Sequence, residues 1–161
     1  MPWRSVAAGV IATFSLDVLS MMAARLQLSA PLPPHLIGRW FAFIARGQLC
    51  HADIAHTPGV SHEMAIALPV HYAIGIVLTG VYILSMSYAG RAPRNLGLAL
   101  AFGLCTNVLP WLLMFPAMGY GFFGSHGPEG TRLFLSSLLN HALFGIGIWL
   151  GVMAAGLRWS G

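Results

Sequence analysis

The chain has 161 residues, of which 57% are hydrophobic and 7% are charged, and its formal net charge at pH 7 is +4. Soluble domains carry about a quarter of their residues as charged side chains, so this composition excludes a soluble globular protein and indicates an integral membrane protein. The basic residues are all arginines and they form no cluster, which excludes a nucleic-acid-binding surface.

Four apolar stretches are long enough to cross about 30 Å of hydrocarbon at about 1.5 Å per helical residue. They lie at residues 6–26, 65–88, 96–118 and 131–157. The first stretch is too long for the apolar core of a signal peptide and contains Asp17, so we expect it to be a retained span. The sequence therefore predicts one all-α domain over residues 1–161, a bundle of four transmembrane helices in a lipid bilayer.

The arginines predict the orientation of these spans. Four crossings place both termini on one side of the membrane. Short segments without acidic residues on that side contain Arg4, Arg91, Arg94 and Arg158. Longer segments on the other side, which also contain acidic residues, hold Arg25, Arg39, Arg46 and Arg132. Because positive charge is denser in the short segments, the positive-inside rule predicts cytoplasmic N- and C-termini.

The long outward segment between the first two spans has two parts. It opens with "SAPLPPH", whose clustered prolines oppose a helix. The following "LIGRWFAFIARGQL" combines aromatic residues with two arginines, which predicts a short helix lying at the membrane interface. In the third span, Pro110 lacks a backbone N–H and predicts a kink just beyond Asn107.

Each span contributes one strongly polar side chain at a similar depth. His71 lies about 10 Å inside the second span and His141 about 15 Å inside the fourth, both counted from the outward side. Asp17 and Asn107 fall at comparable depths in the other two spans. A polar group at such a depth costs a few kcal/mol unless it faces a partner, water or the bundle interior, so all four residues are candidates for function.

Short matching strings suggest an internal repeat. "DVL" begins at Asp17 and "NVL" at Asn107, while the pattern HxxxGI begins at both His71 and His141. A parallel two-helix repeat would make the two histidines pseudo-symmetric partners facing the bundle axis. Chance similarity between short strings is the alternative. The glycine one turn after each histidine either leaves open space beside the ring or allows close helix packing.

These residues predict a polar pocket in the outward half of the bundle. Its predicted lining includes Asp17, Arg39 and Asn107. Imidazole and carboxylate groups are ligands for transition metals. The candidate metal ligands are His51, Glu63, His71 and His141. His71 and His141, on different helices, are also candidates for axial ligation of a haem b. Hydrogen bonding between helices is the structural alternative for the same side chains.

Two other functions fit the same sequence. The chain can be a non-catalytic accessory subunit that packs on other membrane subunits or on copies of itself. A small-solute transporter is a weaker alternative, because the chain lacks a ring of charges that would select ions. No sequence motif defines a catalytic residue, and the two cysteines, Cys50 and Cys105, are expected to be unpaired.

The order of several motifs along the chain resembles a known family. An aspartate in the first span precedes "GRW", "RGQLCHADI", Glu63, "HYAIG", "LPWLLMFPAMGYGF", Arg132 and "NHALFGIG". This order, over nearly the full length, is similar to the bacterial family catalogued as domain of unknown function 2938, whose members are small four-span inner-membrane proteins. The resemblance implies this fold and location, and it implies no activity.

Overall fold

The structure is a computed structural model that describes residues 2–157, and all regular elements within this range are helices. A π-helical turn and a 3-10 turn, η1 and η2, accompany the α-helices. In chain order the elements are α1 (Pro2–Arg25), α2 (Pro34–Ile44), α3 (Glu63–Tyr88), α4 (Leu96–Cys105), η1 (Pro110–Met114), α5 (Phe115–Ala117), η2 (Phe122–Gly124) and α6 (Thr131–Ala154).

Four helical segments of the described chain are long and apolar enough to cross a membrane, which confirms the predicted four-span, all-α architecture. They are Trp3–Arg25, Glu63–Tyr88, Leu96–Ala117 and Thr131–Ala154. The third span combines α4, η1 and α5. Each span starts and ends within a few residues of its prediction, because the length of an apolar run sets the length of a transmembrane helix.

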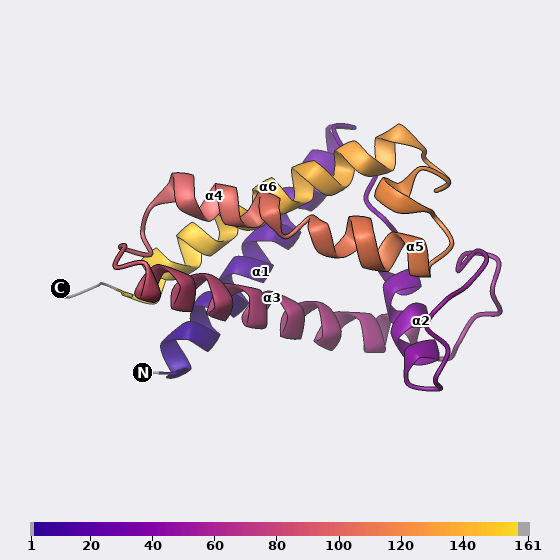
Figure 1. Cartoon of the computed structure of the whole chain (residues 1–161), viewed down its shortest axis with the longest axis horizontal. Coiled ribbons are helices and arrows are strands. Elements are labelled where there is room, and N and C mark those ends of the chain that lie inside the picture. The colour runs from indigo at the N-terminus through magenta and orange to yellow at the C-terminus, as the bar shows by residue number, and fades with distance from the viewer. Residues whose placement is uncertain (1, 158–161) are drawn as a thin grey trace.

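The helices form two pairs joined by one central contact. α1 and α6 pack along each other, α3 packs on α1, and α4 packs on α6 (Figure 1). The central contact depends on small residues: a Cβ atom added to Gly147 or Gly151 of α6 would meet the backbone carbonyl of Ala12 or Ala8 of α1. Glycine at these two positions therefore lets the two backbones approach closely.

Both pairs pack in the same register, as the predicted repeat requires. Aligning Asp17 with Asn107 makes Thr13 equivalent to Gly103, and aligning the two histidines makes Gly75 equivalent to Gly145. A Cβ atom on Gly75 would meet the side chain of Thr13, and one on Gly103 would lie 2.7 Å from the backbone N of Gly145. The glycines after the histidines thus serve close helix packing, which was one of the two readings of the sequence.

The third span is interrupted where its sequence turns polar. α4 ends at Cys105, a turn follows, and η1 begins at Pro110. Proline has no N–H to continue the helical hydrogen-bond ladder, and a π-helical turn accommodates that loss. The kink predicted just beyond Asn107 is therefore a break in the helix, and this break begins at Thr106, directly after the end of α4.

The segment between the first two spans forms the predicted helix, α2, which begins earlier than expected. Pro34 and His35 belong to α2, although the prolines before Leu36 were expected to oppose a helix. A proline in the first turn of a helix loses only an N–H that has no partner within the helix, so it does not prevent helix formation there.

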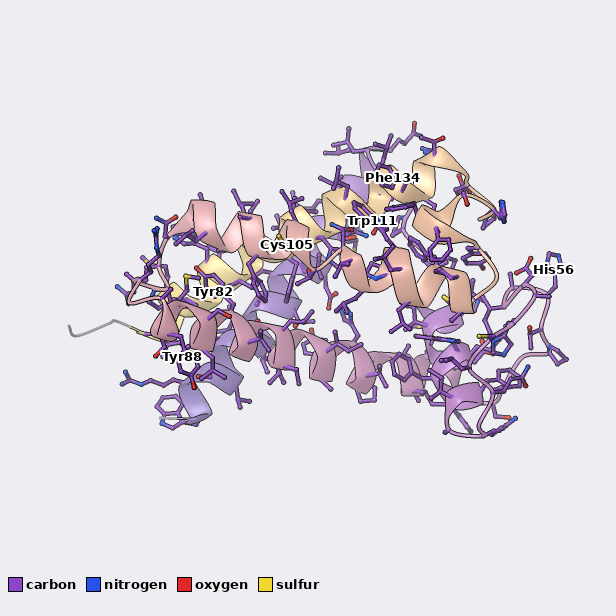
Figure 2. The ribbon with its side chains drawn as sticks, viewed as in Figure 1. His56, Tyr82, Tyr88, Cys105, Trp111 and Phe134 are labelled. Atoms are coloured by element: carbon purple, nitrogen blue, oxygen red, sulfur yellow. The ribbon has the colours of Figure 1, made fainter. Side chains whose placement is uncertain are left out.

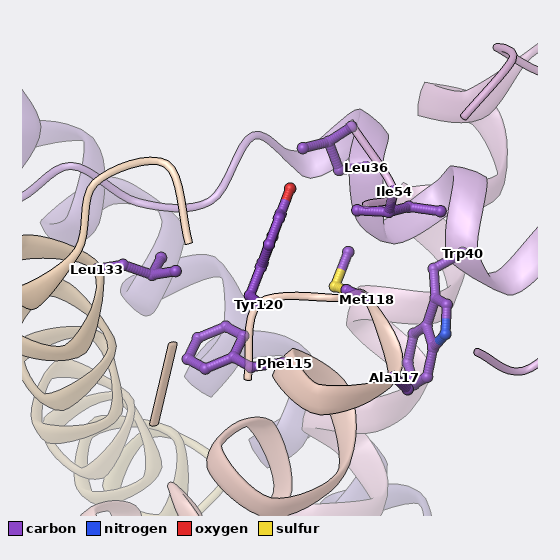
Figure 3. Packing of buried hydrophobic residues seen from close by; sticks show 8 residues of the cluster. All are labelled: Leu36, Trp40, Ile54, Phe115, Ala117, Met118, Tyr120 and Leu133. Atoms are coloured by element: carbon purple, nitrogen blue, oxygen red, sulfur yellow. The ribbon is translucent and has the colours of Figure 1, made fainter. Parts of the chain in front are cut away.

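α2 packs into a hydrophobic cluster with the loop 45–62, the end of the third span, the chain that follows it and the start of α6. The buried members of this cluster are Leu36, Trp40, Ile54, Phe115, Ala117, Met118, Tyr120 and Leu133 (Figure 3). We call this end of the bundle, with α2 and the loop 45–62, the α2 end. The cluster gives the α2 end a core of its own.

The start of α1 and the end of α6 lie together at the opposite end, next to the connection between α3 and α4 (Figure 1). Tyr82 and Tyr88 mark that end and His56 marks the α2 end (Figure 2). This arrangement agrees with an even number of crossings. The cytoplasmic placement of the termini stays a prediction, and Arg158, one of the arginines behind it, lies outside the described residues.

Candidate functional site

The polar side chains of the spans lie in one layer nearer the α2 end and join the helices by hydrogen bonds. Asp17 lies eight residues before the end of α1 and His71 eight residues after the start of α3, each about 12 Å along its helix. His141 lies ten residues after the start of α6, about 15 Å along. The predicted common depth places these groups where they can meet across helices.

Asp17 and His71 form an ion pair between α1 and α3. His71 Nε2 lies 2.8 Å from Asp17 Oδ1, and the Tyr72 hydroxyl donates to Asp17 Oδ2 at 3.1 Å. A carboxylate only accepts hydrogen bonds, so His71 Nε2 carries the proton of this contact, and Nδ1 keeps a lone pair when the ring is neutral. Both carboxylate oxygens therefore have donors, and His71 is the only ion-pair partner of Asp17 among residues 2–157.

The Asp17–His71 pair lies on the wall of an apolar pocket between α1, α2 and α3. This pocket, which we call the dyad pocket, has a volume of about 230 Å³. It is lined by Asp17, Pro34, Ile37, Met64, Ala67, Leu68 and His71. The side chains of His71 and Asp17 are 37% and 40% exposed, so the pair is accessible from the pocket. The dyad pocket thus offers one carboxylate and one imidazole on an otherwise apolar surface.

His71 also borders a second, smaller space that contains His141. This inner cavity has a volume of about 80 Å³ and is lined by Thr13, Leu16, His71, Ile74, Gly75, Leu78, His141 and Phe144. Both histidines therefore meet at one cavity of the bundle. A haem macrocycle is much larger than this space, so the inner cavity does not fit a haem held between the two rings.

His141 is anchored to the break in the third span. Its Nδ1 lies 2.7 Å from Thr106 Oγ1, and the Thr106 hydroxyl donates to the carbonyl oxygen of Gly103 at 2.6 Å. A threonine hydroxyl has a single proton, so Thr106 accepts from His141, and His141 Nδ1 carries the proton. Nε2 is then the lone-pair nitrogen of the neutral His141 ring.

Asn107 has a structural environment. It is fully buried, its Oδ1 accepts from the Ser137 hydroxyl at 2.8 Å, and its Nδ2 donates to the carbonyl oxygen of Leu104 at 3.1 Å. It lines neither the dyad pocket nor the inner cavity. The hydrogen-bonding alternative from the sequence therefore describes Asn107, because its amide groups already have partners within the protein.

Arg39 and Glu63 face each other outside the dyad pocket. Arg39 Nε lies 2.6 Å from Glu63 Oε1, and Nη2 lies 3.2 Å from Oε2. Arg39 also donates from Nη1 to carbonyl oxygens of the loop 45–62, and Glu63 Oε1 accepts from the backbone N of Val60. These contacts fasten the loop to α2 and α3. Arg39 was predicted to line the pocket and Glu63 to bind a metal ion. In the structure, their polar atoms bond to each other and to the loop backbone instead.

His51 lies in the α2 end and lines neither the dyad pocket nor the inner cavity. It is 9% exposed, its ring centroid lies 4.9 Å from that of Phe43, and both ring nitrogens lack a hydrogen-bond partner. Within the described part of the chain, no three histidine, cysteine, aspartate or glutamate residues lie close enough to hold a metal ion. The structure does not assemble the four predicted ligands His51, Glu63, His71 and His141 into one centre.

Two groups near His51 have displaced pKa values. Burial raises the pKa of Asp53 less than its hydrogen bonds to His56 and to the backbone of Ala55 lower it, so this pKa lies below its usual range. Burial, with a smaller contribution from the negative charge of Asp53, raises the pKa of Tyr120. Asp53 and His56 pair at 2.7 Å in the exposed loop, which keeps both side chains away from the spans. The cysteines are unpaired, as predicted, and both are exposed; Cys105 ends α4 (Figure 2).

Several residues of the polar layer were absent from the sequence-based prediction. Ser20 on α1 donates to Asn140 on α6 at 2.9 Å, and Tyr72, Thr106 and Ser137 complete the contacts described above. All five are polar groups inside apolar spans, and each lies within four residues of a predicted site residue. That proximity is the signal that could have found them.

Comparison with known proteins gives one match. Residues 6–155 match a family model described as protein of unknown function (DUF2938). No curated protein and no solved structure matches the chain. The matched region includes the last three spans, all but the first three residues of the first span, the dyad pocket and the inner cavity.

Proposed function

The chain belongs to the DUF2938 family of proteins of unknown function, and from this premise we propose that it binds lipophilic cations in the dyad pocket, with Asp17 as their counter-ion. The ligand class is an amphiphile that combines an apolar body with a protonated amine or a similar cationic head. One observation carries the proposal: the only carboxylate on the wall of an otherwise apolar pocket bonds to His71 and Tyr72 and has no arginine as an ion-pair partner among the described residues.

The charge of the pocket favours a cation. With His71 neutral, the Asp17–His71–Tyr72 group has a net charge of −1 at a depth where charge is poorly solvated. A ligand with a positive head would neutralise this charge, and the attraction is stronger in a low-dielectric setting than in water. An anionic ligand would add a second negative charge and be repelled.

The remaining wall of the pocket favours an apolar body. Pro34 and Ile37 of α2 and Met64, Ala67 and Leu68 of α3 present hydrocarbon or a thioether to the space. The volume of about 230 Å³ lies just below the range of about 300–1,000 Å³ that is common for ligand sites. An amine with a single alkyl chain or a single aryl ring fits these dimensions better than a large cofactor.

A matched series of ligands tests this proposal. We would place the protein in phosphatidylcholine nanodiscs, label its histidines with ¹⁵N, and follow the His71 signal by NMR during titration with decylammonium, decanol or decanoate. Empty nanodiscs correct for partition into lipid. We expect decylammonium to bind most tightly and decanoate most weakly, because the three ligands share a ten-carbon skeleton and their head groups are positive, neutral and negative.

The variant that isolates the counter-ion is Asp17→Asn, which keeps the size of the side chain and removes its charge. We expect it to weaken decylammonium binding by about tenfold or more, equivalent to about 1.4 kcal/mol, and to leave decanol binding nearly unchanged. Glu129→Gln removes a carboxylate outside the pocket and is the control. Equal binding of decanoate and decylammonium, or an unchanged preference in Asp17→Asn, would overturn the proposal.

A second candidate is the accessory-subunit function, and one observation favours it. α3 is the least buried of the four spans, so it presents the largest free apolar face to lipid or to a partner. Co-purification of a stoichiometric membrane partner from native membranes, lost when Val77 and Val81 on that exposed face are changed to tryptophan, would favour this function. A homogeneous monomer that recovers no partner would exclude it.

A further inference from the structure

His71 has a position between two spaces, and Asp17 borders only one of them. The His71 ring lines both the dyad pocket and the inner cavity, whereas Asp17 lines the dyad pocket alone. Since Nε2 of His71 bonds to Asp17, the opposite nitrogen, Nδ1, is the one available to the inner cavity. His141 lines the same cavity from α6, on the other side of the bundle.

The polar atoms available to the inner cavity are all acceptors. The contacts with Asp17 and Thr106 place a proton on His71 Nε2 and on His141 Nδ1, so in the neutral rings His71 Nδ1 and His141 Nε2 carry lone pairs. The Thr13 hydroxyl donates its proton to the carbonyl oxygen of Gly9 at 2.9 Å, which leaves only its oxygen lone pairs. Two acceptors cannot bond to each other, so only a molecule that donates to both can join them.

The size and chemistry of the cavity fit water as that donor. Its volume of about 80 Å³ exceeds the share of about 30 Å³ that one water molecule takes in the liquid. Buried water is stable where two to four polar groups can bind it, and the two protons of one water molecule suffice for the two histidine acceptors. The rest of the wall is formed by Thr13, whose hydroxyl proton is already used, and by Leu16, Ile74, Gly75, Leu78 and Phe144, whose side chains offer no competing donor.

We propose that water bound in the inner cavity bridges His141 and His71, and that His141 is thereby a positioning residue for the cation site. The bridging water donates to His71 Nδ1, which holds the His71 proton on Nε2, where it faces Asp17. This tautomer lets Asp17 remain a charged acceptor. The opposite tautomer would place a lone pair against the carboxylate and would require Asp17 to be protonated.

The effect of the water bridge on cation selectivity rests on the proposed function. The water site itself does not depend on that function. His71 faces Asp17 on α1 and the neighbouring Tyr72, and His141 faces the uncharged Thr106 in the turn after α4. The pocket residues of α2 that lie near His71, Pro34 and Ile37, do not titrate. The only charge that the bridge orients is therefore that of Asp17.

The first test needs no ligand and no variant. In ¹⁵N-histidine-labelled protein in phosphatidylcholine nanodiscs, ring ¹⁵N shifts report the tautomer of each histidine, and cross-peaks with water report bound water at the rings. We expect His71 protonated on Nε2, His141 protonated on Nδ1, and a long-lived water cross-peak to both. Absence of the water signal or the opposite tautomer of His71 would overturn the inference.

Three variants then separate positioning from a merely structural role. His141→Phe removes the bridge, and Ile74→Phe fills the cavity while both histidines stay. We expect both to reduce the fraction of His71 protonated on Nε2 and to lower the preference for decylammonium over decanol by about fivefold or more. His141→Gln keeps a donor for Thr106 and an acceptor for water, so we expect it to restore both readouts.

The outcomes distinguish this inference from the proposed function. An unchanged His71 tautomer in both phenylalanine variants would overturn the positioning role, even if decylammonium binds as proposed. Conversely, an intact water bridge in a protein that shows no preference for decylammonium would overturn the cation function and leave the water site standing. His56→Gln, in the exposed loop, is the control for the loss of one imidazole from the labelled spectrum.

Discussion

The helix pair α1–α3 and the helix pair α4–α6 pack alike, but they hold polar groups of different charge. In the first pair, Asp17 and His71 form a half-exposed ion pair at the dyad pocket. In the second, the equivalent Asn107 is fully buried and bonds to the neutral Ser137, while His141 bonds to Thr106. A charge persists only where a pocket gives it access, because a charge buried without a partner costs several kcal/mol. The comparison supports the proposed binding site in the first pair and a role in helix association for the polar groups of the second.

The largest effect is expected when the second helix pair is given the negative charge of the first. Asn107→Asp would bury a carboxylate beside Ser137 without an opposite charge, and the amide donor to Leu104 would be lost. We expect a loss of about 3–5 kcal/mol in the free energy of unfolding. The measurement is unfolding by SDS in mixed micelles. The reciprocal change, Asp17→Asn, is the control, and we expect it to cost much less because Asp17 is accessible.

The next test uses the glycines that follow the two histidines. A Cβ atom on Gly145 would lie 2.7 Å from the carbonyl oxygen of Ala99, and one on Gly75 would meet the Thr13 side chain. Backbone yields less readily than a side chain, so we expect Gly145→Ala to cost about 1–3 kcal/mol and Gly75→Ala to cost less. Gly80→Ala is the matched control, because nothing lies within 4 Å of its added Cβ atom. Equal costs at the two positions would contradict the difference that we draw between the pairs.

In the second helix pair, the Ser137–Asn107 hydrogen bond stands where the first pair has the Asp17–His71 contact. We expect its loss to have a smaller effect on the free energy of unfolding. Ser137→Ala leaves Asn107 Oδ1 buried without its donor, at a cost of about 1 kcal/mol. Ser20→Ala, which removes the partly buried bond to Asn140, is expected to cost less. Both values come from the same SDS unfolding measurement. If Ser20→Ala proved the more damaging, the central helix contact would depend on polar bonds more than on its small residues.

The smallest effect is expected from a change at the proposed binding site of the first helix pair. Tyr72→Phe removes one neutral donor to Asp17 and leaves the ion pair with His71. The freed carboxylate oxygen should attract a cationic head more strongly, so we expect decylammonium to bind a few times more tightly, with stability changed by less than about 1 kcal/mol. Weaker binding in this variant would show that the tyrosine contacts the ligand itself.

Much of the fold followed from residues alone. The four spans were predictable because transfer into lipid depends on the apolarity of each segment and little on its neighbours. The layer of Asp17, His71, Asn107 and His141 was predictable from counting residues along the helices. The helix at Pro34 was placed too late because proline was treated as a breaker at a position where it is tolerated.

The site was only partly predictable, because partners depend on how each helix is rotated. Arg39 and Glu63 are 24 residues apart and bind each other instead of entering the pocket. His51 is buried at the α2 end, apart from the dyad pocket and the inner cavity. The sequence showed residue types that can bind a metal ion, but it did not show the directions in which their side chains point.

The sequence by itself determined that this chain spans a membrane four times, and at what depth its polar groups lie. Only the tertiary structure decided that Asp17 pairs with His71 at an apolar pocket, that Asn107 pairs with Ser137 in the core, and that the two histidines share one cavity. The physical reason is that hydropathy acts along one segment at a time, whereas a hydrogen bond or a pocket requires atoms from different helices within a few ångströms. That proximity comes from helix packing around small residues such as Gly75 and Gly145.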